Sequence, residues 1–393
     1  MKKGIKGLVI FLLLTLCAGS IYASEIPQQE ETTLLHADSV QLKKSFINKI
    51  LDYFKDSNKE KPRKKFDFSF LAGPHYSSDT GVGLGLLAAG YYRPDLNDTV
   101  TPPSMISLYG DLSSVGFYLI GIRGYHIFPE DRYRVNYKMY FYSFPSKYWG
   151  CGYAEGANDK NESNYKKIEA TITADFQIRL GKHFFIGPSA EFSFIRAKQV
   201  NDPLLWHGEP FLTRSYGFGV KAYLDTRDNL ANAYSGTYLA AEQKVFPRGI
   251  GNDDFNFSSS EIWANWYTKV WKGGVIATQI HSRLTYGHTP WSQLSTLGGS
   301  YTMRGYYEGR YRDKCVADAT VELRQRVWRR NGLVLWGGVG NVFPKPSSFK
   351  WSRTLPNYGI GYRWEFKNRM NVRLDLGFGK GQTGFVFNIN EAF

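Results

Sequence analysis

The chain has 393 residues, a formal charge of +14 and aromatic side chains at 16% of its positions. Beyond its first 23 residues it holds no apolar run of helical membrane length, which excludes a helical membrane protein. Abundant Tyr, Phe and Trp in an otherwise polar chain suit a membrane barrel, whose strands turn only every second side chain towards lipid.

Residues 1–23 have the pattern of a secretory signal peptide. A basic start precedes an apolar run from Leu8 to Leu16, and small residues lead to an expected cut after Ala23. The apolar run is too short to cross a bilayer as a helix. Cys17 raises the alternative of a lipoprotein cut, but the bulky Leu16 before it disfavours lipidation.

The signal peptide limits the partners that a chain of this positive charge can bind. Export argues against nucleic acid, so we expect the basic side chains to bind anionic lipid head groups or lipopolysaccharide. The alternative is that the charge belongs to ordinary lumen and loop side chains and marks no partner.

Residues 24–65 are expected to form a periplasmic linker. Within it, residues 39–56 carry apolar side chains at helical steps of three and four, including Leu42, Phe46 and Ile50. A basic tether, residues 59–65, follows this predicted amphipathic helix. The helix either lies on the inner leaflet or plugs the barrel, or it is a short periplasmic helix with neither role.

From Phe66 to Phe393 the apolar pattern has a period of two. Polar side chains alternate with apolar ones in residues 168–180, 357–366 and 371–378, so each segment has one apolar and one polar face. In the first segment the apolar side chains are Ile168, Ala170, Ile172, Ala174, Phe176, Ile178 and Leu180. About sixteen such segments, joined by connections that alternate between short and long, predict a transmembrane antiparallel β-barrel over residues 66–393. Polar and charged inner faces suit a wet lumen better than a dry core.

Two cysteines, Cys151 and Cys315, fall near predicted loops. An exported protein with two cysteines can form one disulfide, but sequence spacing does not show whether these two meet. Both alternatives stay open.

Several motifs in the second half of the chain point to one family. Residues 297–306 read Leu-Gly-Gly-Ser-Tyr-Thr-Met-Arg-Gly-Tyr, and residues 225–229 read Asp-Thr-Arg-Asp-Asn. Residues 321–324, 359–363 and 372–377 add the patterns Val-Glu-Leu-Arg, Gly-Ile-Gly-Tyr-Arg and Val-Arg-Leu-Asp-Leu-Gly. Over roughly residues 215–393 the chain resembles the BamA/TamA family of outer-membrane proteins, also called the bacterial surface antigen family.

The resemblance implies a long outer loop that folds back into the barrel with Arg304, Gly305 and Tyr306 at its tip. It further implies that Arg304 pairs with Glu322 and locks the loop, because a cation inside a barrel needs a partner and a guanidinium suits carboxylates. The alternative is an exposed loop arginine. Gly338 stands where the family usually carries a second acid, and Asp375 is a candidate to replace it.

Two further expectations concern charge and assembly. Asp225, Arg227 and Asp228 are expected to join Asp375 in a charge network of the lumen or rim, with an architectural role preferred to ordinary solvated charge. Phe393, at the end of an alternating final segment, resembles the tail signal read by the barrel-assembly machinery, which is therefore an expected partner for insertion.

The chain departs from the family at its N-terminus. Family insertases and secretion pores carry periplasmic substrate-binding repeats, but residues 24–65 leave no room for such a domain. The resemblance is therefore to a short form reduced to the barrel. Substrate capture would then depend on the lumen, the barrel seam, or a separate periplasmic or lipoprotein partner.

Motifs of catalysis are missing from the sequence. It holds no nucleophile elbow, no phosphate-binding loop and no zinc helix, and its seven histidines have no metal-ligand spacing. We expect neither an enzyme nor a cofactor or metal. The expected function is insertion or translocation of protein or lipid at the outer membrane; the alternatives are a passive or gated solute pore, and a structural barrel without transport.

Overall fold

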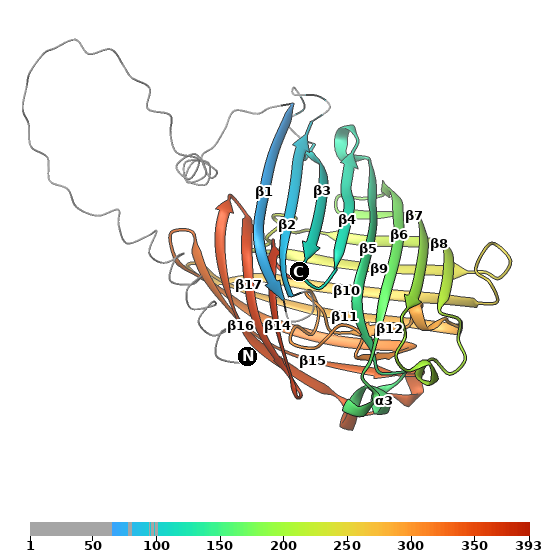
Figure 1. Ribbon diagram of the computed structural model, residues 1–393. Helices are drawn as coiled ribbons and strands as arrows, with labels where there is room; N and C mark the ends of the chain where they lie inside the picture. The colour runs from blue at the N-terminus through green and yellow to red at the C-terminus, as the bar shows by residue number, and fades with distance from the viewer. Residues whose placement is uncertain (1–64, 78–80, 94, 96–97, 99–100) are drawn as a thin grey trace, which may run out of the picture. The chain divides into compact units, whose positions relative to one another are not determined.

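The alternating side chains produce one antiparallel sheet of 16 strands, coloured in chain order in Figure 1. The computed structural model describes residues 65–77, 81–93, 95, 98 and 101–393. The signal peptide, and the linker with its amphipathic helix up to residue 64, lie outside the described residues. In the described part, strands follow one another in chain order around the sheet, while the short strands β12 and β13 form a separate pair.

The first eight strands are β1 (Phe66–Ser77), β2 (Gly81–Tyr92), β3 (Ser104–Ser113), β4 (Tyr118–Ile127), β5 (Tyr133–Tyr148), β6 (Ser163–Arg179), β7 (Phe184–Lys198) and β8 (Leu212–Asp225). The other eight strands of the sheet are β9 (Gly236–Phe246), β10 (Asn256–Trp271), β11 (Gly274–His288), β14 (Cys315–Trp328), β15 (Asn331–Phe343), β16 (Leu355–Lys367), β17 (Met370–Gly379) and β18 (Gln382–Ile389). A one-turn helix, α3 (Tyr153–Ala157), lies in the connection between β5 and β6.

The two faces of the sheet differ in polarity, as the alternation predicts. Large apolar side chains are exposed on the outer face: Leu84, Leu86, Leu108, Ile120, Ile172, Phe218, Val220, Ile262, Val321, Leu335 and Tyr358. Polar side chains are buried on the inner face: Thr171, Gln177, Ser193, Asn265, Gln279, Thr320, Glu322 and Arg373. An apolar outside and a polar inside are the arrangement of a membrane barrel.

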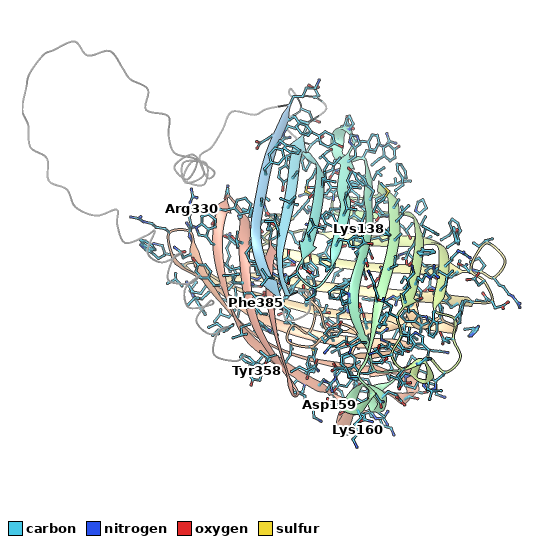
Figure 2. The ribbon with its side chains drawn as sticks, in the orientation of Figure 1. Lys138, Asp159, Lys160, Arg330, Tyr358 and Phe385 are labelled. Carbon is cyan, nitrogen blue, oxygen red and sulfur yellow. The ribbon has the colours of Figure 1, made fainter. Side chains whose placement is uncertain are left out.

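The three longest connections share one end of the barrel, the loop end. They follow β5, β7 and β11 and span residues 149–162, 199–211 and 289–314. The connections after β9 and β15, residues 247–255 and 344–354, lie at the same end. Figure 2 shows Asp159 and Lys160 at this loop end and Arg330, in the turn between β14 and β15, at the opposite end. The rim of the loop end is low on the side where β1 and β18 meet. There the connections between β3 and β4 and between β17 and β18 are short turns, residues 114–117 and 380–381.

The seam is the junction between β1 and β18. These two strands lie in contact and close the sheet into a barrel. Among the pairings of the described residues, no hydrogen-bonded ladder joins them, whereas every other pair of neighbours in the sheet has one. The seam is therefore the weakest junction of the described wall, since backbone ladders hold a barrel together.

Two smaller features complete the fold. No helix in the described ranges is both long and apolar enough to cross a membrane. Cys151 and Cys315, whose pairing the sequence left open, are both free thiols, and the Cys151 Sγ lies 3.9 Å from the Asp313 Oδ1.

Candidate functional site

The connection between β11 and β14, residues 289–314, folds back into the barrel. Its short strands β12 (Ser295–Leu297) and β13 (Tyr311–Asp313) pair with each other, and the segment between them forms the tip. Gly298 and Gly299 turn the chain into the tip with φ angles of +102° and +112°, which favour glycine. The loop is buried in an apolar cluster with the wall, made of Leu297, Met303, Tyr306, Tyr311, Val316, Val342 and Leu355.

Arg304 lies at the centre of the tip with 1% of its surface exposed. One guanidinium nitrogen donates to Glu322 on β14, and the Nη1 donates to the Asp375 Oδ2 on β17 at 2.5 Å. The guanidinium also stacks on the Trp336 ring, 3.9 Å from its centre. The structure therefore places Arg304 beside both acids that the sequence singled out for it.

Gly338 explains how the loop is held without an acid on β15. A Cβ at this position would lie 2.5 Å from the Asn357 Oδ1, so the glycine leaves room for the amide. The Asn357 Nδ2 in turn donates to the Arg304 carbonyl oxygen at 3.0 Å. The side-chain amide of Asn357 on β16 thus holds the loop backbone where an acid was expected, and Asp375 supplies the charge.

The two acids belong to a larger cluster, which we call the anchoring network. Asp375 also accepts from Arg363 at 2.5 Å and from Arg373 at 3.2 Å. The network comprises four guanidiniums and three carboxylates, all buried: Arg304, Arg324, Arg363, Arg373, Glu322, Asp375 and Glu391. Sequence parity places Arg363 and Arg373 on the lumen face, but sequence reasoning missed their partners. Each of the three carboxylates meets at least two guanidiniums, so loss of a carboxylate is less well tolerated than loss of an arginine.

Three glycines bring the tip against the last two strands. Gly305, with φ +111°, packs so closely on Gly377 of β17 that a Cβ on Gly305 would lie 2.7 Å from the Gly377 carbonyl carbon. A Cβ on Gly384 of β18 would lie 3.2 Å from the Gly305 Cα. The Tyr306 hydroxyl fixes the same end of the loop, because it donates to the Pro356 carbonyl at 2.7 Å and accepts from the Lys380 N–H at 2.8 Å. The tip thus touches the strands next to the seam.

We expect Gly377→Ala to loosen the loop. The added methyl would lie 2.6 Å from the Arg304 carbonyl oxygen, a backbone atom that must move, which costs about 1–3 kcal/mol. Denaturant unfolding and protease cleavage of the loop measure the effect. Gly337→Ala is the matched control, because the nearest atom to its new methyl lies 4.0 Å away. Equal stability and equal cleavage of the two variants would contradict the close contact.

A family model described as the Omp85 superfamily domain matches residues 126–393, from β4 to the end of the chain. The chain belongs to the Omp85 superfamily. The resemblance predicted from the motifs of the second half is thereby confirmed, and it extends into the first half of the barrel.

Solved structures of the same superfamily share the fold. BamA from Haemophilus ducreyi, lacking POTRA domains 1–3, is similar with a TM-score of 0.56 and 12% identity over 84% of this chain and 71% of that chain. CdiB from Acinetobacter baumannii gives 0.52 and 15% over 84% and 60%, and CdiB from Escherichia coli gives 0.55 and 11% over 83% and 63%. This Omp85 chain therefore spans less than two thirds of either CdiB chain. No curated protein matches it by sequence.

The end of this Omp85 chain departs from the expected strand. The sequence predicts alternation up to Phe393, but β18 ends at Ile389, and Asn390 turns the backbone with φ +68°. Glu391 then accepts from the Arg363 Nε at 2.8 Å, and Phe393 packs on Tyr267 inside the barrel. Buried arginines attract the acidic tail more strongly than the ladder holds it. The assembly-signal role of Phe393 stays a prediction.

The Asp225–Asn229 motif builds the turn between β8 and β9, residues 226–235. Arg227 pairs with Asp225, at 2.8 Å between Nη2 and Oδ2. Asp228 reaches instead to Arg369, 2.9 Å away in the turn between β16 and β17, and Arg369 stacks on the Tyr234 ring. Asp375 belongs to the anchoring network, and among the described residues no hydrogen bond or ion pair joins it to this turn. The expected single charge network is thus three separate groups. The Asp225–Arg227 and Asp228–Arg369 pairs lie at the end opposite the three longest connections.

We expect the Asp228 contact to weaken only in acid. Burial raises the pKa of this carboxyl, but N–H donors from Tyr234 and Ser235 and the Arg369 guanidinium outweigh it, so its pKa lies below the usual 3.8. A lowered pKa stabilises the fold above the unfolded-state value, and the effect disappears as pH falls through the folded-state pKa. Native protein should exceed Asp228→Asn in unfolding free energy by about 1 kcal/mol at neutral pH. A gap that stays the same as the pH falls from neutral to well below 3.8 would contradict this assignment.

A metal or cofactor has no evident place in this site. Over residues 65–393, apart from the few positions left undescribed, the histidines, cysteines and acids form no group of three or more that could hold a metal ion. The anchoring network is an arginine-rich cluster, which repels cations. Its fixed charges hold the loop in place through buried ion pairs.

Proposed function

We propose that this protein lies in the outer membrane of a Gram-negative bacterium and inserts or translocates protein or lipid there, without catalysis. The observation that carries the proposal is the contact of the folded-in loop with β17 and β18, through Gly305, Gly377 and Gly384. One loop thereby lies in the lumen and supports the strands beside the seam. Release of the loop would free both the lumen and the seam as paths for a cargo.

Separate partners complete this proposal. Capture of a cargo is assigned to the lumen, the seam, or a periplasmic or lipoprotein partner. The barrel-assembly machinery is proposed to insert the protein itself. Phe393 is proposed as the aromatic residue that such a machinery reads, with Phe385 and Phe387 preceding it on β18.

A gated solute pore is the second candidate. The lumen holds a cavity of about 240 Å³ lined by Lys221, Tyr238, Ala240, Glu242, Glu261 and Trp263. Lumen ion pairs such as Lys221–Asp175, at 3.2 Å, line a path suited to water and ions. Large, steady conductance of the pure native barrel in a planar bilayer would favour this candidate over the first.

Site-specific photo-cross-linking tests the translocation proposal. A photoreactive phenylalanine analogue replaces Phe387, an outward residue on β18 beside the seam, in cells that make the protein. We expect adducts with outer-membrane proteins or lipids in transit. The control is the same replacement at Ile262, which faces outward on β10, far from the seam. Identical adducts at both sites would contradict a route through the seam.

A further inference from the structure

Three cations face outward at the loop end of β6 and β7. Lys166 and Lys198 are register partners, and Arg196 is the partner of Ile168 one step further along. Paired residues of an antiparallel ladder share a face, so all three side chains belong to the outer, apolar-rich surface. Like charges directly opposite each other repel, and the ladder alone gives no reason to place two lysines there.

No acid neutralises these cations in the described part of the chain. Neither Lys166, Arg196 nor Lys198 has a carboxylate within ion-pair distance among the described residues. Lys167, which faces the lumen, shows the contrast, because it pairs with Glu169 at 2.6 Å. The neighbouring Arg214 on β8 is also paired, with Asp253 at 3.7 Å. Lys166, Arg196 and Lys198 thus form a positive patch, the cation patch, which an anion from outside the described chain would neutralise.

An apolar surface continues directly from this patch. The next outward register pairs along the ladder are Ala170 with Phe194 and Ile172 with Phe192. Ile172 is 45% exposed, and on the next strand Phe218 is 53% exposed. A band of cations bordering an apolar surface matches an amphiphile with an anionic head and hydrocarbon tails.

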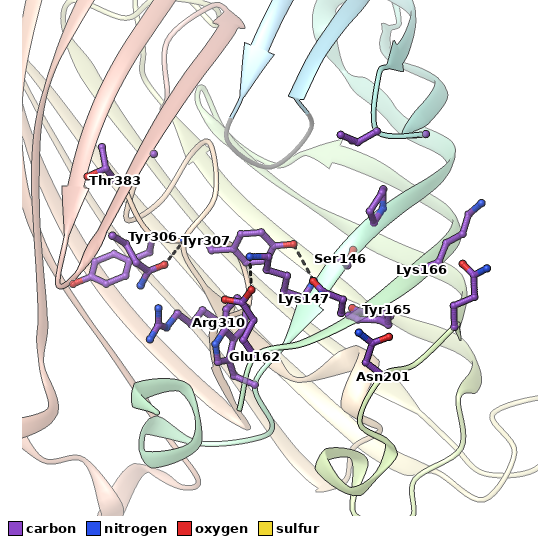
Figure 3. A pocket seen from close by; sticks show the side chains of 18 of the residues that line it. Ser146, Lys147, Glu162, Tyr165, Lys166, Asn201, Tyr306, Tyr307, Arg310 and Thr383 are labelled. Carbon is purple, nitrogen blue, oxygen red and sulfur yellow. Dashed lines mark hydrogen bonds and ion pairs between the residues drawn. The ribbon is translucent and has the colours of Figure 1, made fainter. Parts of the chain in front are cut away.

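A cavity adjoins the patch and shares Lys166 with it. β4 begins at Tyr118, which pairs with Ser143, so the last residues of β5 have no neighbour on that side. The space left there is a cavity of about 760 Å³. Figure 3 shows Tyr165, Lys166 and Asn201 on one side of it and Tyr306 and Thr383 on the other.

The lining of the cavity suits a saccharide. Side-chain amides such as Asn164, Gln199 and Asn201 offer both donors and acceptors for hydroxyl groups. Two lining side chains also carry buried donors without a hydrogen-bond partner, the Trp149 Nε1 and the Gln382 Nε2. Buried polar groups are normally satisfied, so these donors point to an absent acceptor.

We propose that this cavity and the cation patch bind the phosphorylated saccharide head group of an outer-leaflet lipid, whose acyl chains lie along Ile172 and Phe192. The inference rests on the membrane placement in the proposed function and names a lipid that the barrel holds beside its loop tip. The saccharide occupies the cavity, and the phosphates meet Lys166, Arg196 and Lys198. The lipid then lies beside the end of β5, which also holds the loop, because the Tyr307 hydroxyl accepts from the Lys147 N–H at 3.1 Å.

Binding of bis-phosphorylated, acylated lipid A to the purified barrel in detergent tests the proposal. We expect the triple variant Lys166→Gln, Arg196→Gln, Lys198→Gln to weaken binding at least about tenfold, since each cation near an anionic head group contributes about a factor of five. The control triple variant Lys182→Gln, Lys272→Gln, Arg329→Gln removes the same charge at the opposite end and should bind as the native protein does. Equal weakening by both triples overturns the proposal.

Further probes separate the parts of the ligand. Asn201→Trp narrows the cavity without changing charge and should also weaken binding at least about fivefold. Dephosphorylated lipid A should bind no better to native protein than to the patch variant. Binding of the deacylated, phosphorylated disaccharide in preference to lipid A would overturn a membrane source. Conductance and cross-linking at the seam are separate readouts, so a failed transport proposal remains distinguishable from a failed lipid site.

Discussion

Asp375→Asn should destabilise the barrel more than loss of any single arginine in the anchoring network. The Asp375 carboxylate accepts from Arg304 and Arg363 at 2.5 Å and from Arg373 at 3.2 Å, and its side chain is fully buried. Asparagine keeps the shape but leaves these guanidiniums facing one another without a charge between them. Removing one partner of a buried ion pair costs about 3–5 kcal/mol, and we expect a loss in this range in denaturant unfolding.

The matched control for this prediction is Asp175→Asn on β6. Asp175 also lies in the lumen, but it meets a single cation, Lys221, at 3.2 Å, and it is 12% exposed. A partly exposed pair of this kind contributes about 1 kcal/mol or less. If both variants lose the same stability, the arginines around Asp375 do not depend on its charge, and the anchoring network does not stabilise the barrel through that charge.

Arg304→Ala should open the barrel while costing less stability than Asp375→Asn. After the change Glu322 keeps Arg324 at 2.8 Å, and Asp375 keeps Arg363 and Arg373, so both carboxylates remain paired. The loop, however, loses its only side chain that bridges β14 and β17 among the described contacts. We expect closed native channels and conducting variant channels in a planar bilayer, with about 1–3 kcal/mol lost on unfolding.

Two companion variants sharpen this test. Arg304→Lys keeps the charge but replaces a planar fork by a point donor, so it should conduct at an intermediate level. Arg248→Ala removes an exposed ion pair with Asp254, whose partners are 67% and 82% exposed, and should leave conductance unchanged. If native protein and Arg304→Ala share one large, steady conductance, Arg304 holds no plug and a diffusion pore becomes the better explanation.

The sequence predicted the wall of the barrel well because its signal is local. A period of two decides the face of each side chain without reference to any other strand, so Ile172 faces outward and Glu322 inward as expected. The loop tip was found by resemblance, since Arg304, Gly305 and Tyr306 stand in one short motif. The same local pattern predicted about sixteen strands, and the 16-stranded sheet of the structure confirms that count.

The partners inside the lumen were harder to predict because they join distant residues. Parity shows that Arg363 and Arg373 face the lumen, but not that both meet Asp375 beside Arg304, which is 71 residues earlier in the chain. Trp336 and Asn357 gave no signal of their own. The extension of the last strand to Phe393 was wrong, because period two says nothing about whether a tail stays in the ladder or turns inward to buried charge.

By itself, the sequence determined the all-β class, the two faces of each strand and the motif at the loop tip. Each of these depends on residues close together in the chain, whose geometry the backbone dictates. Only the tertiary structure decided which charges meet, where Glu391 goes, and that the turn holding Asp228 reaches Arg369. Closure of the sheet brings these groups together, and electrostatic attraction in a shielded lumen then selects among partners that are all of suitable charge.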